Sequence, residues 1–324
     1  MMKEKFICLS VAATLAAAAV AGPVIPRDEA IEQKVEATLA RMTLDEKIGQ
    51  MTELAIDLIA HRGPDGKLVY HPGMLDSIVG KYKVGSILNA PQHALTPGEW
   101  NEFIGKIQDA SMREIGIPCI YGLDQNHGVT YTQGGTLFPQ NINVAATFNP
   151  ALAEEAAAIT AYETRATACP WTYSPTVDLV RVASWPRVWE NFGEDPYLSG
   201  VMGAAQIRGF QGTDPNHIGK DKIATSVKHY MGYGAPFSGQ DRTPAVISEA
   251  DLHRLWSVRP AEIFNLPLNR FEPGDPADFF LFDPEEKWTV SRETLYSKSY
   301  NTPFLGREMQ GRVRHHWLGG VQLF

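Results

Sequence analysis

The pattern of apolar positions predicts a series of amphipathic helices. Ile31, Val35 and Leu39 recur every four residues, which is the spacing of one helix face. A threonine followed three residues later by a glutamate forms a capping box, and this marks a helix start at Thr43 and again at Thr96. We expect helices over the stretches that begin near residues 28, 43, 96, 149 and 197.

Short apolar runs lie between these predicted helices. Residues 84–90 and 117–124 read as buried strands, and two further strands are predicted within 171–180 and 222–230. Strands that alternate with amphipathic helices are typical of a parallel α/β domain, either an open sheet or a barrel. No G-x-G-x-x-G follows the first strand and no G-x-x-x-x-G-K-[ST] occurs in the chain, so the nucleotide-binding versions of this fold lose support.

The first residues predict a secretory signal peptide over 1–21. Lys3 and Lys5 precede an apolar run at 6–18, and the small residues "AVA" form a cleavage site before Gly22. A membrane anchor is the weaker alternative, because the run is too short to span a bilayer and no later segment is long enough. We therefore expect a periplasmic or secreted protein with no membrane span.

Composition and charge narrow the classes of partner. The 324 residues carry a net charge of −8, which argues against a nucleic-acid partner, because phosphate binding needs clustered positive charge. Beyond the signal peptide only Cys119 and Cys169 remain, and two cysteines so far apart are weak evidence for a disulfide. No His, Asp or Glu cluster has metal-ligand spacing, so we expect no metal and no cofactor.

Polar residues follow the predicted strands at their carboxyl ends. Asp124 closes the strand "IYGLD", Arg187 follows the third strand, and Lys228 and His229 close the fourth. If the strands form a barrel, residues at these ends converge on one mouth, so we expect the four side chains to point into one cavity. A carboxylate acceptor together with three donors suits a polyhydroxylated ligand.

Each of these residues also has a structural explanation. Asp124 can cap the start of a loop, Lys228 can be an exposed strand end, and Arg187 can pair with Glu190 or Glu194. The joint occurrence of the four residues at successive strand ends favours the binding site.

Neighbouring residues carry three further expectations. Trp185 and Trp189 would offer apolar faces to sugar rings, whereas His127 reads as a structural histidine that fixes its loop. Successive side chains of a regular strand point to opposite faces. Lys228 and His229 can therefore share a pocket only if residues 228–232 are distorted, through a bulge or a non-proline cis peptide.

Several motifs over about residues 30–256 resemble glycoside hydrolase family three, the β-glucosidase and exo-β-glucanase group. They read, in order, "RMTLDEKIGQM", "GLDQNHGV", "TLFPQNINVAATFNPALAEEAAAITAYETRA", "WPRVWENFGEDPYLSG" and "VKHYMGYG". In that family the corresponding aspartate, arginine and Lys-His pair bind the non-reducing sugar, which implies the same role for Asp124, Arg187, Lys228 and His229. Pro186 stands where many members have glycine.

The resemblance also implies an activity. It is the exo-acting, retaining hydrolysis of terminal non-reducing β-D-glucosyl residues from a β-glucoside or β-glucan oligosaccharide. Retention needs two carboxyl groups about 5–5.5 Å apart. The family's nucleophilic aspartate lies in an "SDW"-like segment, and its acid/base carboxyl comes from outside the barrel. Neither segment is identified in this chain, so no catalytic residue is assigned.

From residue 258 onward the sequence resembles the C-terminal tail of a dihydroorotase, a cytoplasmic amidohydrolase. The motifs are "RPAEIFNL", "GDPADFFLFDP", "WTV" and "NTPFLGREMQGRV". We therefore predict a chimera of a partial barrel over 22–256 and a dihydroorotase-like segment over 257–324. The expected fold is an incomplete TIM-type (β/α) barrel whose open edge is partly covered by a short β-rich tail.

Three functions remain open from the sequence. The first is a glycoside hydrolase, and the second is a sugar-binding module that does not hydrolyse its ligand. The third, an amidohydrolase, ranks last because the zinc-binding "HxH" it needs early in a barrel is absent.

Overall fold

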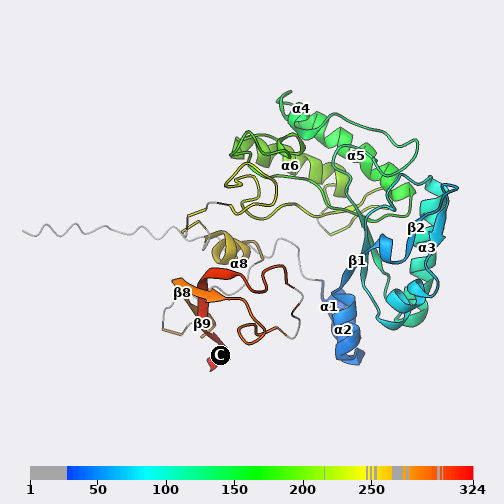
Figure 1. Cartoon of the computed structure of the whole chain (residues 1–324). Helices are drawn as coiled ribbons and strands as arrows, with labels where there is room; N and C mark the ends of the chain where they lie inside the picture. Colours follow the sequence, from blue (N-terminus) through cyan, green and yellow to red (C-terminus); the bar gives the residue numbers. More distant parts are fainter. Residues whose placement is uncertain are drawn as a thin grey trace, which may run out of the picture. The chain divides into compact units, whose positions relative to one another are not determined.

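The computed structural model describes residues 28–214, 216–245, 247–248, 250–251, 254–264, 273–274, 277–297, 300 and 302–323 (Figure 1). The predicted signal peptide, residues 1–21, lies outside the described residues. The chain divides into two compact units. The larger lies within 25–252, and the described residues of the smaller lie within 253–324.

A parallel sheet forms the centre of the larger unit. Its strand order is β1-β4-β5-β6-β7, and every neighbouring pair is parallel. The strands are β1 (Glu53–Ala55), β4 (Ser86–Leu88), β5 (Ile120–Leu123), β6 (Trp171–Thr172) and β7 (Ala224–Thr225). Within the described residues β1 and β7 do not pair with each other, so the sheet is open and no barrel is closed. The predicted α/β class and the incomplete barrel are thus confirmed.

The helices of the larger unit lie where the sequence pattern predicts them, with one addition. They are α1 (Glu29–Arg41), α2 (Leu44–Gln50), α3 (Pro97–Glu114), α4 (Asn141–Ala145), α5 (Pro150–Ala166) and α6 (Pro196–Gln211). Both predicted capping boxes are present, at Thr43 and at Thr96. The short helix α4 was not predicted. No helix among the described residues is long and apolar enough to cross a membrane.

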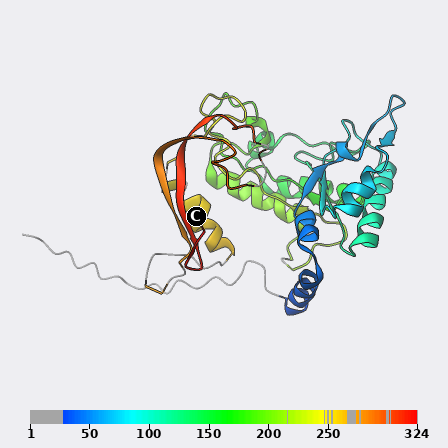
Figure 2. The ribbon, with the colours of Figure 1, turned by 60° about the horizontal axis from the view of Figure 1, so that its bottom comes forward.

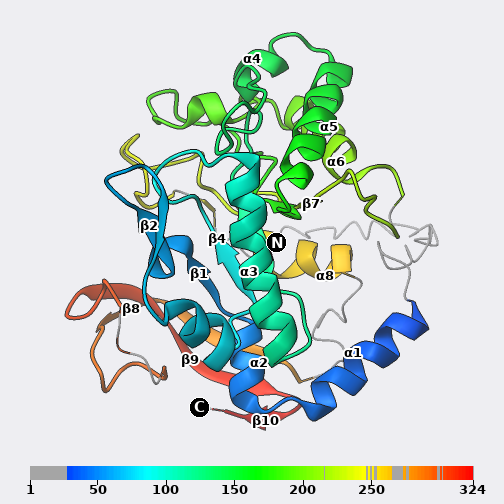
Figure 3. The same ribbon diagram turned by 90° about the vertical axis from the view of Figure 1, so that its right-hand side faces the viewer.

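Helix α3 lies against the sheet (Figure 3), and one large buried cluster contains residues of both. Trp100, Phe103 and Ile107 of α3 pack in the same buried cluster as Ile87 of β4 and Tyr121 of β5. All five side chains are fully buried. Burial of this apolar area holds the strands in register and so fixes where their carboxyl ends lie.

Two smaller features lie outside the predicted pattern. A hairpin of β2 (Ala60–Arg62) and β3 (Leu68–Tyr70) follows β1. Short helical turns span Ile56–Leu58, Asp76–Lys81, Val188–Glu190 and Arg254–Val258.

The smaller unit is built on a long antiparallel hairpin, drawn in orange and red in Figure 2. Its strands are β8 (Phe279–Thr289), β9 (Glu308–Leu318) and β10 (Val321–Gln322), and α8 (Arg259–Phe264) precedes them. The Trp288 indole donates a hydrogen bond to the backbone oxygen of Gly311 at 2.9 Å. The β-rich tail is therefore present, whereas its covering of the open sheet edge stays a prediction.

Candidate functional site

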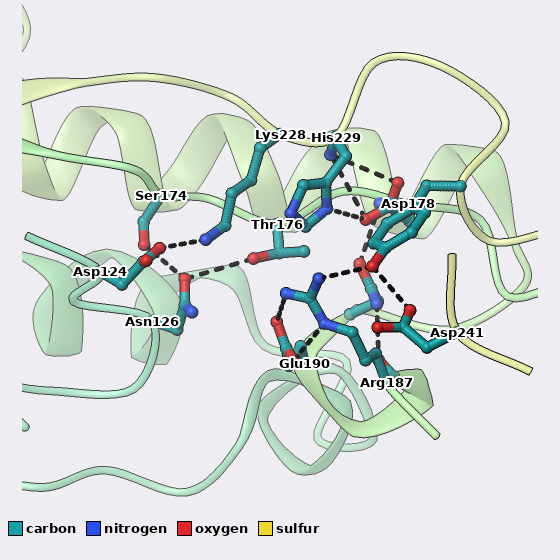
Figure 4. A network of polar contacts seen from close by, with 12 residues as sticks. Asp124, Asn126, Ser174, Thr176, Asp178, Arg187, Glu190, Lys228, His229 and Asp241 are labelled. Atoms are coloured by element: carbon teal, nitrogen blue, oxygen red, sulfur yellow. Dashed lines mark hydrogen bonds and ion pairs between the residues drawn. The ribbon is translucent and has the colours of Figure 1, made fainter. Parts of the chain in front are cut away.

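The predicted site residues gather at the carboxyl ends of the parallel strands (Figure 4). Asp124 directly follows β5, and Lys228 follows β7 and bridges to Thr176. The Lys228–His229 peptide bond is cis, and so is the bond between Tyr230 and Met231. The predicted distortion over 228–232 is thus confirmed.

Asp124 and Lys228 form an ion pair in which the Lys228 ammonium donates to Asp124 Oδ1. The Lys228 side chain is only 17% exposed, which rules out the alternative of an exposed strand end. A carboxylate accepts several hydrogen bonds and an ammonium donates three. Both groups therefore keep capacity for a ligand after pairing with each other.

His229 pairs with Asp178, a buried carboxylate that the sequence reasoning missed. His229 Nδ1 lies 2.9 Å from Asp178 Oδ2, and the Asp178 side chain is 1% exposed. The backbone N–H of His229 also donates to this carboxylate. The bond to Nδ1 fixes the orientation of the ring and leaves Nε2, which has no partner within the described residues, for a ligand.

Arg187 is held by a fork of hydrogen bonds from one side. Its Nε donates to Glu190 Oε1 at 2.6 Å, and its Nη2 donates to Glu190 Oε2 at 2.5 Å. The pairing with Glu190 that the sequence offered as an alternative is therefore present. This hydrogen-bonded carboxylate raises the pKa of Arg187. A third bond runs from Nη1 to the hydroxyl of Tyr233 at 3.1 Å, so two of the five guanidinium N–H groups remain for a ligand.

Tyr233 connects the arginine to the histidine. Its hydroxyl donates to Asp241 Oδ1 at 2.6 Å while it accepts from Arg187, and its ring meets that of His229 at 4.7 Å. The indole of Trp185 also donates to Asp241 Oδ1, at 3.1 Å. The hydrogen bond from Tyr233 is the main cause that lowers the pKa of Asp241. The ion pair of Asp124 with Lys228 and the contacts that join His229, Tyr233 and Arg187 thus form two neighbouring polar groups, which meet at the Lys228–His229 peptide bond. We call the two groups together the network.

Three other sequence expectations can be judged here. Trp185 is 2% exposed, so the prediction that it offers a face to a sugar ring is wrong, whereas Trp189 is 45% exposed. The reason is that the Trp185 indole points at Asp241 and packs edge-on against Tyr233. His127 Nδ1 lies 3.1 Å from the backbone oxygen of Phe138, which confirms its structural role.

The two cysteines are free and buried. Burial raises the pKa of Cys119 and of Cys169 to about 12. The possible disulfide is therefore absent. No group of three or more His, Cys, Asp or Glu side chains among the described residues is arranged to hold a metal ion.

A shallow hollow of about 330 Å³ adjoins the network. Its lining residues are His229, Tyr230, Met231, Gly232, Tyr233, Thr243 and Ala245. Asp124, Arg187 and Lys228 are not among them. The opening of all four predicted residues into a single cavity stays a prediction.

Comparisons with known proteins agree with this architecture. Residues 43–257 match the model of the glycosyl hydrolase family 3 N-terminal domain. The lysosomal beta glucosidase of Dictyostelium discoideum is 39% identical over 289 residues, which covers 85% of this chain and 34% of that protein. The periplasmic beta-glucosidase of Salmonella typhimurium is 30% identical over 215 residues, which covers 66% of this chain and 25% of that protein.

A solved structure gives the same picture. The exo-1,3/1,4-beta-glucanase of a Pseudoalteromonas species superposes with a TM-score of 0.63 at 29% sequence identity, over 75% of this chain and 30% of that chain. The chain spans between about a quarter and a third of the length of the two curated relatives. The alignment with the Dictyostelium protein covers 85% of this chain, which is more than residues 1–257 could account for. The similarity therefore extends beyond residue 257, where the family match ends.

Proposed function

The chain belongs to glycosyl hydrolase family 3, and we propose that it functions in an exo-acting β-glucosidase. In this role its larger unit binds the non-reducing terminal sugar of a β-glucoside or β-glucan oligosaccharide. The observation that carries the proposal is that the Asp124–Lys228 ion pair and the contacts that hold His229 and Arg187 lie side by side at the ends of the parallel strands (Figure 4). The names of the relatives, two beta-glucosidases and an exo-beta-glucanase, support the substrate class.

Each residue has a distinct part in holding the sugar. Asp124 accepts hydrogen bonds from sugar hydroxyls, and the ammonium of Lys228 and the two remaining N–H groups of Arg187 donate to them. His229 offers Nε2, because Asp178 occupies Nδ1. Buried Asp178 and Glu190 fix the imidazole and the guanidinium before any ligand arrives, which reduces the ordering cost of binding.

We propose that hydrolysis follows the mechanism of the family, in which two carboxyl groups act and the anomeric configuration of the sugar is retained. This chain's own contribution is to bind and orient the sugar, since neither the nucleophile nor the acid/base segment is identified in it. That observation also favours a second candidate function, in which the chain binds a sugar without hydrolysing it.

We also propose a periplasmic or secreted location. The signal-peptide pattern over residues 1–21 supports it, as do the names of the periplasmic and lysosomal relatives. For residues 257–324 we keep the proposal of a dihydroorotase-like origin, which the end of the family match at residue 257 supports. The longer alignment with the Dictyostelium protein weighs against a sharp junction there.

Hydrolysis of p-nitrophenyl β-D-glucoside separates the two candidate functions. A glycoside hydrolase releases p-nitrophenol, and the Asp124→Ala variant releases none. A sugar-binding protein releases none in either form but still binds glucose. Release of p-nitrophenol at the same rate by both forms would show that the network has no part in the reaction.

A further inference from the structure

A narrow cavity lies beneath the loop that follows Asp124. Its volume is about 10 Å³, and its lining comes from the loop at 125–128, residues 138–139, and the helices α4, α5 and α6. The residues that line it are mostly buried. This volume is close to the space that one water molecule needs.

Two buried glutamine side chains line this cavity, and each has one polar atom without a hydrogen-bond partner among the described residues. The residues are Gln125, which is fully buried, and Gln206, which is 5% exposed. Among the described residues, Gln125 Nε2 and Gln206 Oε1 have no hydrogen-bond partner. The first is a donor and the second an acceptor, and an unsatisfied buried polar atom is unfavourable.

We propose that one internal water molecule occupies this cavity and bridges the two amides. Its oxygen accepts from Gln125 Nε2, and one of its hydrogens is donated to Gln206 Oε1. Thr160 also lines the cavity, and its hydroxyl already donates to the backbone oxygen of Ala156 at 2.8 Å, so the Thr160 oxygen accepts the second hydrogen. Three polar partners are the usual number for a buried water.

The water closes a buried polar chain between the two halves of the candidate site. On one side, Gln206 Nε2 donates to Asn141 Oδ1 at 2.8 Å, and Asn141 Nδ2 donates to the backbone oxygen of Glu190 at 2.8 Å. Glu190 is the residue that holds Arg187.

On the other side, Gln125 directly follows Asp124 and anchors its loop. Its backbone N–H donates to Thr172 Oγ1 at 3.1 Å, and its Oε1 accepts from the backbone N–H of Thr130 at 3.2 Å. The bridged water therefore couples the position of the Asp124 loop to that of Glu190. This inference does not depend on the proposed function, because it concerns the packing beneath the site.

A crystal structure of the full chain at about 1.8 Å resolution tests the proposal. We expect one well-ordered density peak within hydrogen-bonding distance of Gln125 Nε2 and Gln206 Oε1. A direct hydrogen bond between the two amides, or a cavity without density, would overturn the proposal.

Magnetic relaxation dispersion of water gives a second, independent readout in solution. It counts long-lived internal waters, and we expect Gln206→Met to lower that count by one. The matched control is Gln211→Met, the same substitution on the same helix, which loses the hydrogen bonds from Thr225 but does not line the cavity. An equal count in Gln206→Met and in the unchanged chain would contradict the proposal. If Gln206→Met does not fold, the crystal structure of the unchanged chain decides.

Discussion

Arg187 is positioned by groups on both of its sides. Glu190 holds one edge of the guanidinium through two hydrogen bonds, and Tyr233 takes a third from Nη1. Tyr233 is itself fixed by its hydrogen bond to Asp241. The hydroxyl of Tyr233 therefore links Asp241 to the arginine.

The Tyr233→Phe variant removes this hydroxyl and keeps the ring. Arg187 loses one hydrogen bond and Asp241 loses another, so we expect the affinity for glucose to fall about tenfold, since a hydrogen bond to a charged group contributes about 1.5–3 kcal/mol. Titration calorimetry measures the change. The control is Tyr197→Phe, whose ring is 80% exposed. Equal affinities for Tyr233→Phe and the unchanged chain would show that this hydroxyl does not position Arg187.

The lowered pKa of Asp241 implies that the stability of the folded chain depends on pH. Its pKa is lowered chiefly by the hydrogen bond from Tyr233, so its ionised form stabilises the folded state at pH values above its unfolded pKa. This contribution is lost as the pH falls through the lower, folded pKa. We expect Asp241→Asn to melt below the unchanged chain at pH 7 and the gap in Tm to narrow below about pH 4. A gap of the same size at pH 7 and pH 3 would refute the assignment.

The sequence predicted the residues that we propose to contact a sugar better than the residues that hold them. Asp124, Lys228 and His229 stand at strand ends, where position along the chain signals convergence. Asp178 and Tyr233 act through buried hydrogen bonds across separate loops, and their local sequence carries no periodic signal. Tyr233 lies within the motif "VKHYMGYG", whereas Asp178 lies outside the motifs that resemble the family.

The end of helix α2 packs closely against the segment that leads into strand β4. A side chain on Gly49 would overlap the backbone oxygen of Tyr82 and would lie 2.9 Å from the backbone oxygen of Lys83. Gly85 likewise faces the backbone of Gln50. The absence of Cβ atoms at these two glycines allows α2 to approach the segment that enters β4.

Gly49→Ala is predicted to destabilise the larger unit by about 1–3 kcal/mol, because backbone atoms cannot move aside as a flexible side chain can. The matched control is Gly105→Ala within α3, where an added Cβ meets no atom within 4 Å. We expect that substitution to stabilise by about 0.5–1 kcal/mol, since alanine favours the helix. Urea unfolding measures both. A loss of stability at Gly105 as large as that at Gly49 would contradict the packing argument.

Helices were easier to predict from the sequence than strands. The capping boxes at Thr43 and Thr96 act locally, so the sequence identifies them directly. β6 and β7 are two residues long each, shorter than predicted, and Pro175 lacks the N–H that would extend the β6 ladder. β1 has the sequence "ELA", which shows no apolar run, and only its pairing with β4 makes it a strand.

Among the described residues, the larger unit has two open strand edges and a helix whose apolar side chains are exposed. β1 and β7 each pair on one side only. Helix α1 buries none of its residues, and Ile31, Val35 and Leu39 are 56%, 45% and 41% exposed. Open edges and exposed apolar faces promote association between chains.

We therefore expect the isolated chain to self-associate as its concentration rises. Sedimentation velocity over a range of concentrations measures this, with the sedimentation coefficient increasing with concentration. A soluble monomer that melts in one cooperative transition at all concentrations would contradict the expectation that the open edge drives association.

Binding of glucose, measured by titration calorimetry on the full chain, tests the central claim that the network around Asp124 holds a sugar. The account predicts that the unchanged chain binds glucose and that Asp124→Ala removes the binding, because the carboxylate both accepts from sugar hydroxyls and holds Lys228. Asp65→Ala, in the β2–β3 turn, is the control and should bind as the unchanged chain does. Equal affinity of Asp124→Ala and the unchanged chain would contradict the account.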